Sequence, residues 1–450
     1  MPMPRLGQFC LTSQIVLAPL LLGGARPWAM AVLTILTGIG LIVTGWRSRM
    51  ELTPGIRQIV LAGALVSLWL VLQAIPIWPL QPLPFDAPRI ALYPNAWQSM
   101  IGNIVWLVGT CILAAQNARN QGAAFIHHIA VAVVVSASIQ AILAAFADAM
   151  ALKTTYWFAK QAHLGDWTGT FANRNAFGGL MAIATLCCLY LFCRRSATTT
   201  GQRIDHAGGW VAFALIFTAA VIESHSRSAV MTLAIAVAGF AILYRPARFR
   251  IGIWRATYPV LIIISMLAIL TIIAAMAPDL GNRFAELARP DLIQRDDAWQ
   301  TALIAISHRP LAGFGPDAIA LVMDHFAITG LNRNAAWFSS HNLWLDAALV
   351  FGIPTTILIV GFILYRLSRA IRNTGNRADQ TLLITLAIVS GTIASLGWVA
   401  SLPALILPFL SVLCGLEAAP KAQGCEVSQY LDGYPRSEPR LPAPALSPRD

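Results

Sequence analysis

Charged side chains are scarce in this sequence. Only 11% of the 450 residues are Asp, Glu, Lys or Arg, whereas 57% are hydrophobic. Soluble globular domains carry about 25% charged residues, so this composition excludes a typical soluble protein. It predicts an all-α, polytopic membrane bundle, because each spanning helix needs about 20 largely apolar residues.

Cysteine is also sparse, and the seven cysteines show no spacing typical of a disulfide framework or a metal site. All but Cys425 lie in or beside apolar runs, which predicts reduced core side chains. The sequence lacks a Walker loop and the G-x-G-x-x-G, G-x-S-x-G and H-E-x-x-H patterns. We therefore expect no nucleotide, metal or other cofactor.

Acidic residues are outnumbered by basic ones, 20 to 31, which gives a net charge of +11. In a membrane protein this excess indicates cytoplasmic loops rather than nucleic-acid binding. Apolar windows predict about twelve helices, at 9–24, 28–46, 57–75, 99–117, 124–146, 175–193, 208–224, 228–244, 257–277, 342–365, 381–398 and 402–417. Most basic residues then fall in alternate short loops. Both termini are thus predicted to be cytoplasmic, with the long loops 76–98, 148–174 and 278–341 facing outward.

Three regions follow from this pattern. Residues 1–150 form N-terminal transmembrane helices, and residues 151–417 form a second transmembrane region that contains the large loop 278–341. Residues 418–450 are polar and rich in proline, which predicts a disordered cytoplasmic tail.

Polar groups interrupt the apolar pattern at GDWTGTFANRNAFGGLMAI, directly before a predicted helix. Asn173, Arg174 and Asn175 are candidate substrate-binding residues, because free helix amides and a guanidinium suit an anion or a sugar. The alternative is a loop that is merely capped.

A second interruption, VIESHSRSAVMTL, separates two closely spaced helices and holds Glu223, His225 and Arg227. Charge at membrane depth costs at least about 2.5–3.5 kcal/mol unless it is paired or lines a watery cavity. Glu223 and Arg227 could pair at i,i+4 spacing. Arg227 also suits diphosphate, because its planar fork matches phosphate oxygens.

The third interruption is the large loop with the start of the helix that follows it. Arg295 begins a stretch whose apolar positions Trp299, Leu303 and Ile306 share one helix face, which predicts a helix near the membrane surface. Further on, SSHNLWLDAALVFGIP places His341 after two serines that can cap the next helix.

His341 in a first helical turn would be held neutral by the helix dipole, as a general base requires. Asn342 and Asp346 are candidate substrate contacts, and Asp346 has no obvious partner in the sequence. The alternative for His341 is an interfacial histidine that only caps the helix.

The sequence resembles the O-antigen ligase and polysaccharide polymerase superfamily in four ordered stretches. These are GTFANRNAFGGLMA, SHSRSAVMTLAIA, RDDAWQTALIAISHRPLAGFGPDAI and SSHNLWLDAALVFGIP, which together cover residues 165 to 360 approximately. The first 150 residues match only as generic membrane helices. The resemblance implies about twelve helices in a bacterial inner membrane, with cytoplasmic ends and one large periplasmic loop.

The resemblance also implies a glycosyltransferase that takes a glycan from undecaprenyl diphosphate on the periplasmic face. A ligase transfers it to lipid A-core, a polymerase to the next repeat unit, and related members to proteins. By position, Arg227 and Arg295 match arginines expected to hold the diphosphate, and His341 matches the histidine expected near the acceptor hydroxyl. The family usually has a small residue, often glycine, after the first arginine, so Ser228 departs slightly.

Two other classes remain open from the residues alone. A transporter or flippase of lipid-linked glycan would also be polytopic and lack nucleotide motifs, but it should carry charges along a path open to both sides. The outward clustering of the charged groups favours an enzyme. An envelope scaffold with an inert loop is the other alternative.

Overall fold

The computed structural model describes residues 4–47, 51–78, 88–195, 203–244, 291–334 and 336–418. Within these ranges every regular element is a helix, apart from an isolated antiparallel bridge between Thr154 and Ala159. The predicted all-α class is therefore confirmed.

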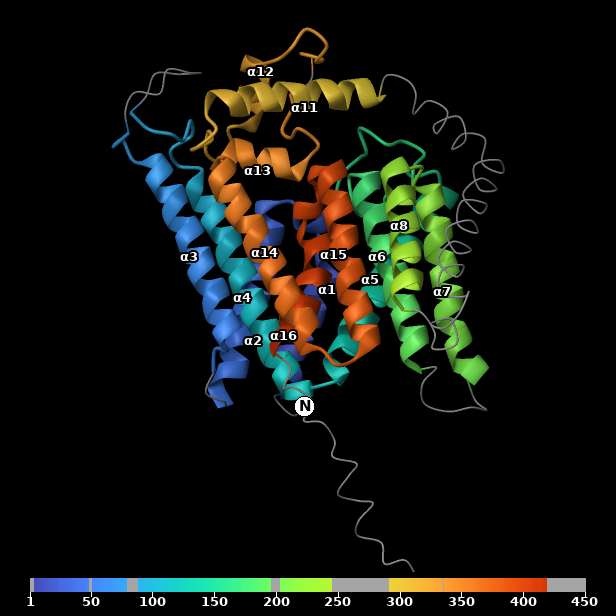
Figure 1. Ribbon diagram of the computed structural model, residues 1–450. Coiled ribbons are helices and arrows are strands. Elements are labelled where there is room, and N and C mark those ends of the chain that lie inside the picture. The colour runs from blue at the N-terminus through green and yellow to red at the C-terminus, as the bar shows by residue number, and fades with distance from the viewer. Residues whose placement is uncertain are drawn as a thin grey trace, which may run out of the picture.

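Most of the chain forms a bundle of up-and-down helices (Figure 1). Its members are α1 (Pro4–Leu20), α2 (Pro27–Arg47), α3 (Pro54–Ala74), α4 (Trp97–Gln121), α5 (Ala124–Ala149), α6 (Arg174–Arg195), α7 (Arg203–Glu223), α8 (Arg227–Leu243), α14 (Ile353–Asn373), α15 (Arg377–Leu396) and α16 (Pro403–Ala418), with short 3-10 turns η1 (Leu22–Gly24) and η4 (Trp398–Ser401). Among the described helices, seven are long and apolar enough to cross a membrane, and four shorter ones are apolar too. The chain is a multi-pass membrane protein. The helix predicted at 257–277 lies outside the described residues, so the number of twelve stays a prediction.

Helix starts follow local capping chemistry. Thr53 Oγ1 accepts a hydrogen bond from the Ile56 N–H at 3.3 Å before α3, whose first residue is Pro54. Asn376 Oδ1 accepts from the Ala378 N–H at 2.8 Å before α15. These side chains satisfy amides that the helix leaves unpaired, which explains why the boundaries are readable in the sequence.

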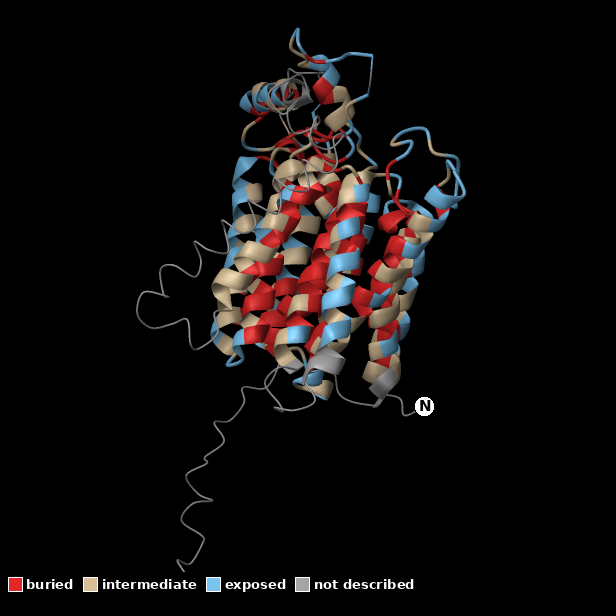
Figure 2. Ribbon diagram, turned by 90° about the vertical axis from the view of Figure 1, so that its right-hand side faces the viewer, coloured by how far each residue is buried: buried red, intermediate tan, exposed pale blue. Residues whose placement is uncertain are grey.

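One hydrophobic core joins the helices α1 to α8 and α14 to α16, and α6 contributes the most buried residues to it. Small residues let helices approach closely: a Cβ on Gly178 of α6 would lie 2.3 Å from the Ala229 Cβ of α8. Buried residues fill the interior, whereas exposed ones line the outside (Figure 2). The outward side chains include Ile35, Ile42 and Leu61, each more than half exposed, as expected of surfaces that meet lipid.

Three helices that precede α14 close one end of the bundle, which we call the α11 end. There α11 (Asp291–His308) lies across the bundle, with α12 (Ile319–His325) and α13 (Leu343–Phe351) beside it (Figure 1). A second apolar cluster holds these helices together through Ala298, Ala302 and Ala305 of α11. Of the predicted apolar face, Ile306 is buried, Trp299 is half-buried and Leu303 is 56% exposed. The helix predicted in this loop is therefore present, but its protein-facing surface is the alanine row.

The helix predicted at 342–365 is not continuous, and this prediction is wrong. It divides into α13 and α14 at Gly352, whose φ of 82° is outside the helical region. A Cβ there would lie 2.3 Å from the Leu311 carbonyl oxygen, so only glycine fits. The Ile353 N–H bonds to the Pro310 carbonyl at 2.8 Å, so the preceding loop fills the break.

That loop also closes the end of α13. The N–H groups of Phe314 and Gly315 donate to the carbonyls of Leu349 and Val350 at 2.7 and 3.1 Å. Carbonyls at a helix end have no partner inside the helix, so the N–H groups of the turn at 310–316 pair with them. The short α13 is thereby fixed at the α11 end.

Candidate functional site

Polar side chains gather at the α11 end in two groups. The Asp166 group lies where α6 and α8 begin, and consists of Lys160, His163, Asp166, Arg174 and His225. The His341 group lies at the start of α13, and consists of Arg295, Trp337, Ser339, Ser340, His341 and Asp346.

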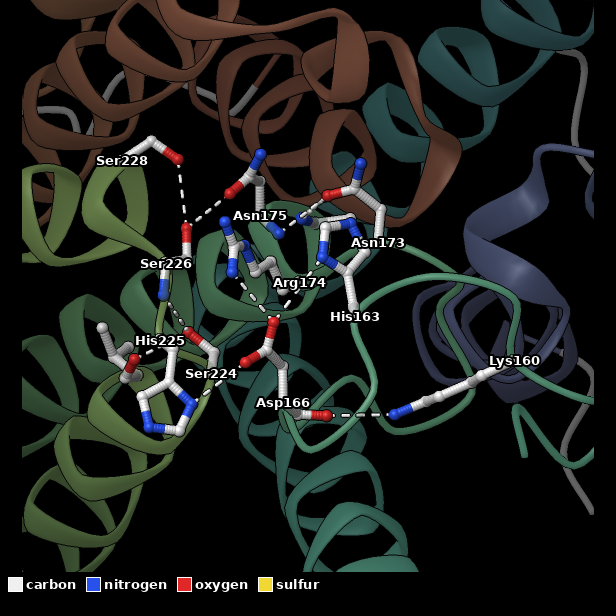
Figure 3. A network of polar contacts seen from close by, with 12 residues as sticks. Lys160, His163, Asp166, Asn173, Arg174, Asn175, Ser224, His225, Ser226 and Ser228 are labelled. Atoms are coloured by element: carbon white, nitrogen blue, oxygen red, sulfur yellow. Dashed lines mark hydrogen bonds and ion pairs between the residues drawn. The ribbon is translucent and has the colours of Figure 1, made fainter. Parts of the chain in front are cut away.

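Asp166 is the centre of the first group (Figure 3). Its carboxylate is 7% exposed and accepts a hydrogen bond from Arg174 Nη1 at 2.9 Å. His225 Nδ1 lies 3.1 Å from Asp166 Oδ1, and His163 Nδ1 lies 3.6 Å from Oδ2. Lys160 Nζ donates to the backbone carbonyl of Asp166 at 3.0 Å. One buried carboxylate thus connects the loop before α6 with the turn before α8.

The start of α6 is capped by Asn173. Its Oδ1 accepts from the N–H groups of Asn175 and Ala176 at 2.7 and 3.3 Å. Arg174 faces Asp166, so its charge is partly neutralised within the protein. Asn173 therefore has the capping role that the alternative interpretation gave it, and substrate binding by this segment stays a prediction.

The turn between α7 and α8 is held by α6. Ser226 caps α8 by accepting from the Ala229 N–H at 3.2 Å, and its hydroxyl donates to Asn175 Oδ1 of α6 at 2.6 Å. Arg227 is the next residue, half-buried in the first turn of α8. Because residues 224–226 break the helix, the i,i+4 spacing does not place Glu223 and Arg227 on one helix face.

In the second group, Asp346 holds the two serines that precede His341. Its carboxylate, 6% exposed, accepts from Ser339 Oγ at 2.5 Å, from the Ser340 N–H at 2.8 Å and from Ser340 Oγ at 2.6 Å. The His341 N–H donates to Ser339 Oγ at 2.9 Å. The partners of Asp346, which were not obvious in the sequence, are these two serines, because the chain folds back onto the carboxylate. Asp346 thus holds the segment that leads into His341.

The cap of α13 is Asn342, and not the serines as expected. Its Oδ1 accepts from the N–H groups of Trp344 and Leu345 at 3.0 and 3.4 Å. His341 precedes this cap and has a φ of 59°, so it lies outside the first helical turn. The dipole argument for a neutral imidazole therefore does not apply to it.

Another cause nevertheless favours the neutral form of His341. Burial lowers the pKa of its imidazole, and the positive charge of Arg295 on α11 lowers that pKa further, whereas the Asp346 carboxylate opposes the shift. The Trp337 ring meets the imidazole edge-on, with centroids 5.7 Å apart. The structure thus brings Arg295 and His341, 46 positions apart in the sequence numbering, within electrostatic reach.

Arg227 lies at the same end of the molecule, because α8 begins there (Figure 1). Both α8 and α13 pack against α15, and Trp344 Nε1 of α13 donates to Ser395 Oγ of α15 at 3.0 Å. The three predicted catalytic residues, on α8, on α11 and just before α13, therefore lie at the same end of the bundle. Within the described ranges, no set of three or more His, Cys, Asp or Glu side chains is arranged to hold a metal ion.

Sequence reasoning missed Asp166, Trp337 and the role of the serines. Asp166 was visible as an isolated acid within an otherwise apolar and amide-rich stretch. Trp337 carried no signal, because its contact with His341 depends on the path of the loop.

A family model described as O-antigen ligase matches residues 212–360. The matched segment begins within α7, ends within α14 and contains Arg227, Arg295 and His341, whereas Asp166 precedes it. A comparison with curated proteins finds no match. The predicted resemblance is confirmed over residues 212–360, which are similar to the O-antigen ligase family, and this match favours a membrane glycosyltransferase of ligase or polymerase type.

Proposed function

We propose that this protein transfers a glycan from undecaprenyl diphosphate to an acceptor hydroxyl, with lipid A-core as the acceptor. The reaction takes place at the α11 end. The observation that carries the proposal is the burial of His341 within electrostatic reach of the cationic Arg295, both of which lower the pKa of its imidazole. A neutral imidazole can accept a proton while a neighbouring cation stabilises a departing phosphate.

The distribution of arginine supports a periplasmic position for the α11 end. Arg57, Arg119 and Arg194 lie at the opposite end, near the start of α3 and the ends of α4 and α6. The last turns of α14 add Arg366, Arg369 and Arg372. By the positive-inside rule the opposite end is cytoplasmic, which gives a bacterial inner-membrane protein with both termini inside.

In the proposed reaction the acceptor oxygen attacks the anomeric carbon of the donor sugar. The bond from that carbon to the diphosphate oxygen breaks, and undecaprenyl diphosphate leaves with the electron pair. Arg227 and Arg295 stabilise the negative charge that builds on the diphosphate, and His341 accepts the proton of the hydroxyl. Attack from the face opposite the leaving group inverts the anomeric configuration.

A direct test reconstitutes the full chain in liposomes with undecaprenyl diphosphate-linked glycan and lipid A-core. General-base catalysis is worth about 10²–10⁴-fold, so His341→Ala should reduce transfer by that factor. His325→Ala, on the exposed end of α12, is the matched control and should retain activity. Undiminished transfer by His341→Ala would contradict the proposal.

A polymerase is the second candidate, because the same chemistry serves when the acceptor is the next lipid-linked repeat unit. Envelope glycans from a deletion strain distinguish the two. Unattached polymer indicates a ligase, whereas single repeat units on lipid A-core indicate a polymerase. Unchanged glycans would contradict both.

A further inference from the structure

A pocket of about 200 Å³ lies between α12 and the loop that leads to His341. Its floor is apolar and includes Met323 and Leu331, both buried. Its rim carries Asp324, Asn332 and Arg333, which are exposed. Trp337 forms the remaining wall.

Trp337 connects this pocket to the candidate base. Its indole Nε1 donates to the Asn332 carbonyl at 2.8 Å, which fixes the ring against the loop. The same ring meets His341 edge-on at 5.7 Å between centroids. Trp337 therefore contacts both the pocket and the imidazole.

The rim keeps hydrogen-bonding capacity for a ligand. The Asp324 carboxylate accepts no hydrogen bond from the described residues. Arg333 uses Nη2 to donate to the Ala327 carbonyl at 2.9 Å, which leaves further guanidinium N–H groups. Asn332 Oδ1 accepts from the Asn334 N–H at 2.9 Å, which leaves its amide N–H₂ for other partners.

This combination suits a sugar ring. A pyranose has an apolar C–H face that packs on an aromatic ring, and hydroxyls around its edge that need both donors and acceptors. Pockets for drug-sized ligands measure roughly 300–1,000 Å³, so a smaller pocket suits one ring rather than an extended chain.

We propose that this Trp337 pocket binds a sugar of the acceptor glycan and presents its hydroxyl to His341. The inference rests on the proposed function, because His341 acts on the acceptor in that reaction. In the proposed reaction Arg295 and Arg227 bind the donor diphosphate, so we assign the Trp337 pocket to the acceptor.

The first experiment measures transfer by the full chain with donor and acceptor varied separately. Trp337→Ala should raise the KM for lipid A-core by about tenfold and leave the KM for the lipid-linked donor unchanged. Trp337→Phe should recover most of the loss, because it keeps an aromatic face. Asp324→Asn should raise the acceptor KM by a smaller factor.

Phe338→Ala is the matched control, because Phe338 is 78% exposed and lies outside the pocket in the same loop. It should leave both KM values unchanged. The inference is overturned if Trp337→Ala leaves the acceptor KM unchanged, or if Phe338→Ala raises it equally.

A second experiment is independent of catalysis. Free core oligosaccharide, without lipid, is titrated into the purified full chain in nanodiscs and followed by saturation-transfer NMR, with a free repeat-unit oligosaccharide for comparison. Binding of either probe should be lost in Trp337→Ala and retained in Phe338→Ala. Binding that survives in Trp337→Ala would overturn the inference.

The two experiments separate the inference from the proposed function. If the protein transfers no glycan, but oligosaccharide binding depends on Trp337, the pocket stands and the proposed reaction fails. If transfer depends on His341, but neither the acceptor KM nor oligosaccharide binding depends on Trp337, the reaction stands and the pocket assignment fails.

Discussion

At the scale of single residues, buried carboxylates position the candidate catalytic side chains. Asp346 binds both serines before His341, and Asp166 binds His225, two residues before Arg227. His225 and His341 have φ values of 48° and 59°, a backbone conformation that costs a non-glycine residue about 1–3 kcal/mol. Hydrogen bonds to the carboxylates offset this cost, so each histidine is held in one place.

The pH dependence of transfer should follow the charges around His341. Because its pKa is lowered, the base stays neutral at pH 7, and kcat/KM should fall only as the pH drops through the lowered value. Arg295→Gln removes a positive charge that lowers the pKa of His341, so the fall in kcat/KM at low pH, which we call the acidic limb, should move to higher pH. Asp346→Asn removes a charge that raises the pKa, so the limb should move to lower pH.

These shifts are measured from the residual activity of each variant between about pH 4 and pH 9. Arg26→Gln, on an exposed arginine before α2, is the control and should leave the limb in place. Shifts of the same sign in Arg295→Gln and Asp346→Asn would contradict this account of His341.

Asp166→Asn should weaken both stability and donor binding. The substitution removes the carboxylate charge and weakens the hydrogen bonds that Arg174 and His225 make to it. Each hydrogen bond to a charged group stabilises a fold by about 1.5–3 kcal/mol. The turn before Arg227 should then be less ordered. We expect a lower thermal midpoint in detergent and a raised KM for the lipid-linked donor.

The matched control is Asp148→Asn, at an exposed position near the end of α5. It should change neither quantity. An unchanged donor KM in Asp166→Asn, together with a lowered midpoint, would show that Asp166 stabilises the fold without positioning Arg227.

At the scale of elements, the division between α13 and α14 decides the shape of the site. A continuous helix would carry residues 343–351 along the bundle axis, whereas the break at Gly352 lets α13 lie at the α11 end. The loop at 310–316 fills the break, and its N–H groups donate to the last carbonyls of α13. The position of His341 therefore depends on a contact between segments that are about forty residues apart.

Gly352→Ala should destabilise the protein. At φ 82° and ψ 162° the backbone of Gly352 lies in a region that costs other residues about 1–3 kcal/mol, and the alanine Cβ would collide with the Leu311 carbonyl at 2.3 Å. Gly361→Ala in α14 is the matched control, because a Cβ there meets nothing within 4 Å. Alanine is favoured over glycine inside a helix by roughly 0.8–1.0 kcal/mol, so that variant should be neutral or stabilised. Thermal midpoints in detergent compare the two, and equal midpoints would contradict the argument.

At the scale of the whole molecule, the bundle separates its polar ends. The α11 end carries the two polar groups described above, and the opposite end carries the arginines of α3, α4, α6 and α14. Exposed positions line the outer surface between them (Figure 2), and Ile35, Ile42 and Leu61 are among the apolar side chains there. This arrangement allows a lipid tail to remain in the bilayer while its head group reaches the α11 end.

The proposed orientation can be tested by cysteine labelling. Phe338→Cys at the α11 end should react with a membrane-impermeant maleimide added to intact spheroplasts, whereas Arg372→Cys at the end of α14 should react only after permeabilisation. Unsubstituted protein gives the background of the native cysteines. The reverse pattern would place the site in the cytoplasm.

The sequence by itself determined the features that depend on near neighbours along the chain. Apolar runs predicted the helical bundle, and cap residues such as Asn173 marked helix starts, because both arise from bonds within a few residues. The order of the polar motifs likewise predicted the superfamily that the match at residues 212–360 confirms.

Only the tertiary structure decided which side chains meet. Asp346 lacked a partner in the sequence because the fold-back of Ser339 and Ser340 depends on the loop before α13. The break at Gly352, the partners of Asp166 and the proximity of Arg295 to His341 also depend on contacts between distant segments. Such contacts follow from how the helices pack, which local propensity does not encode.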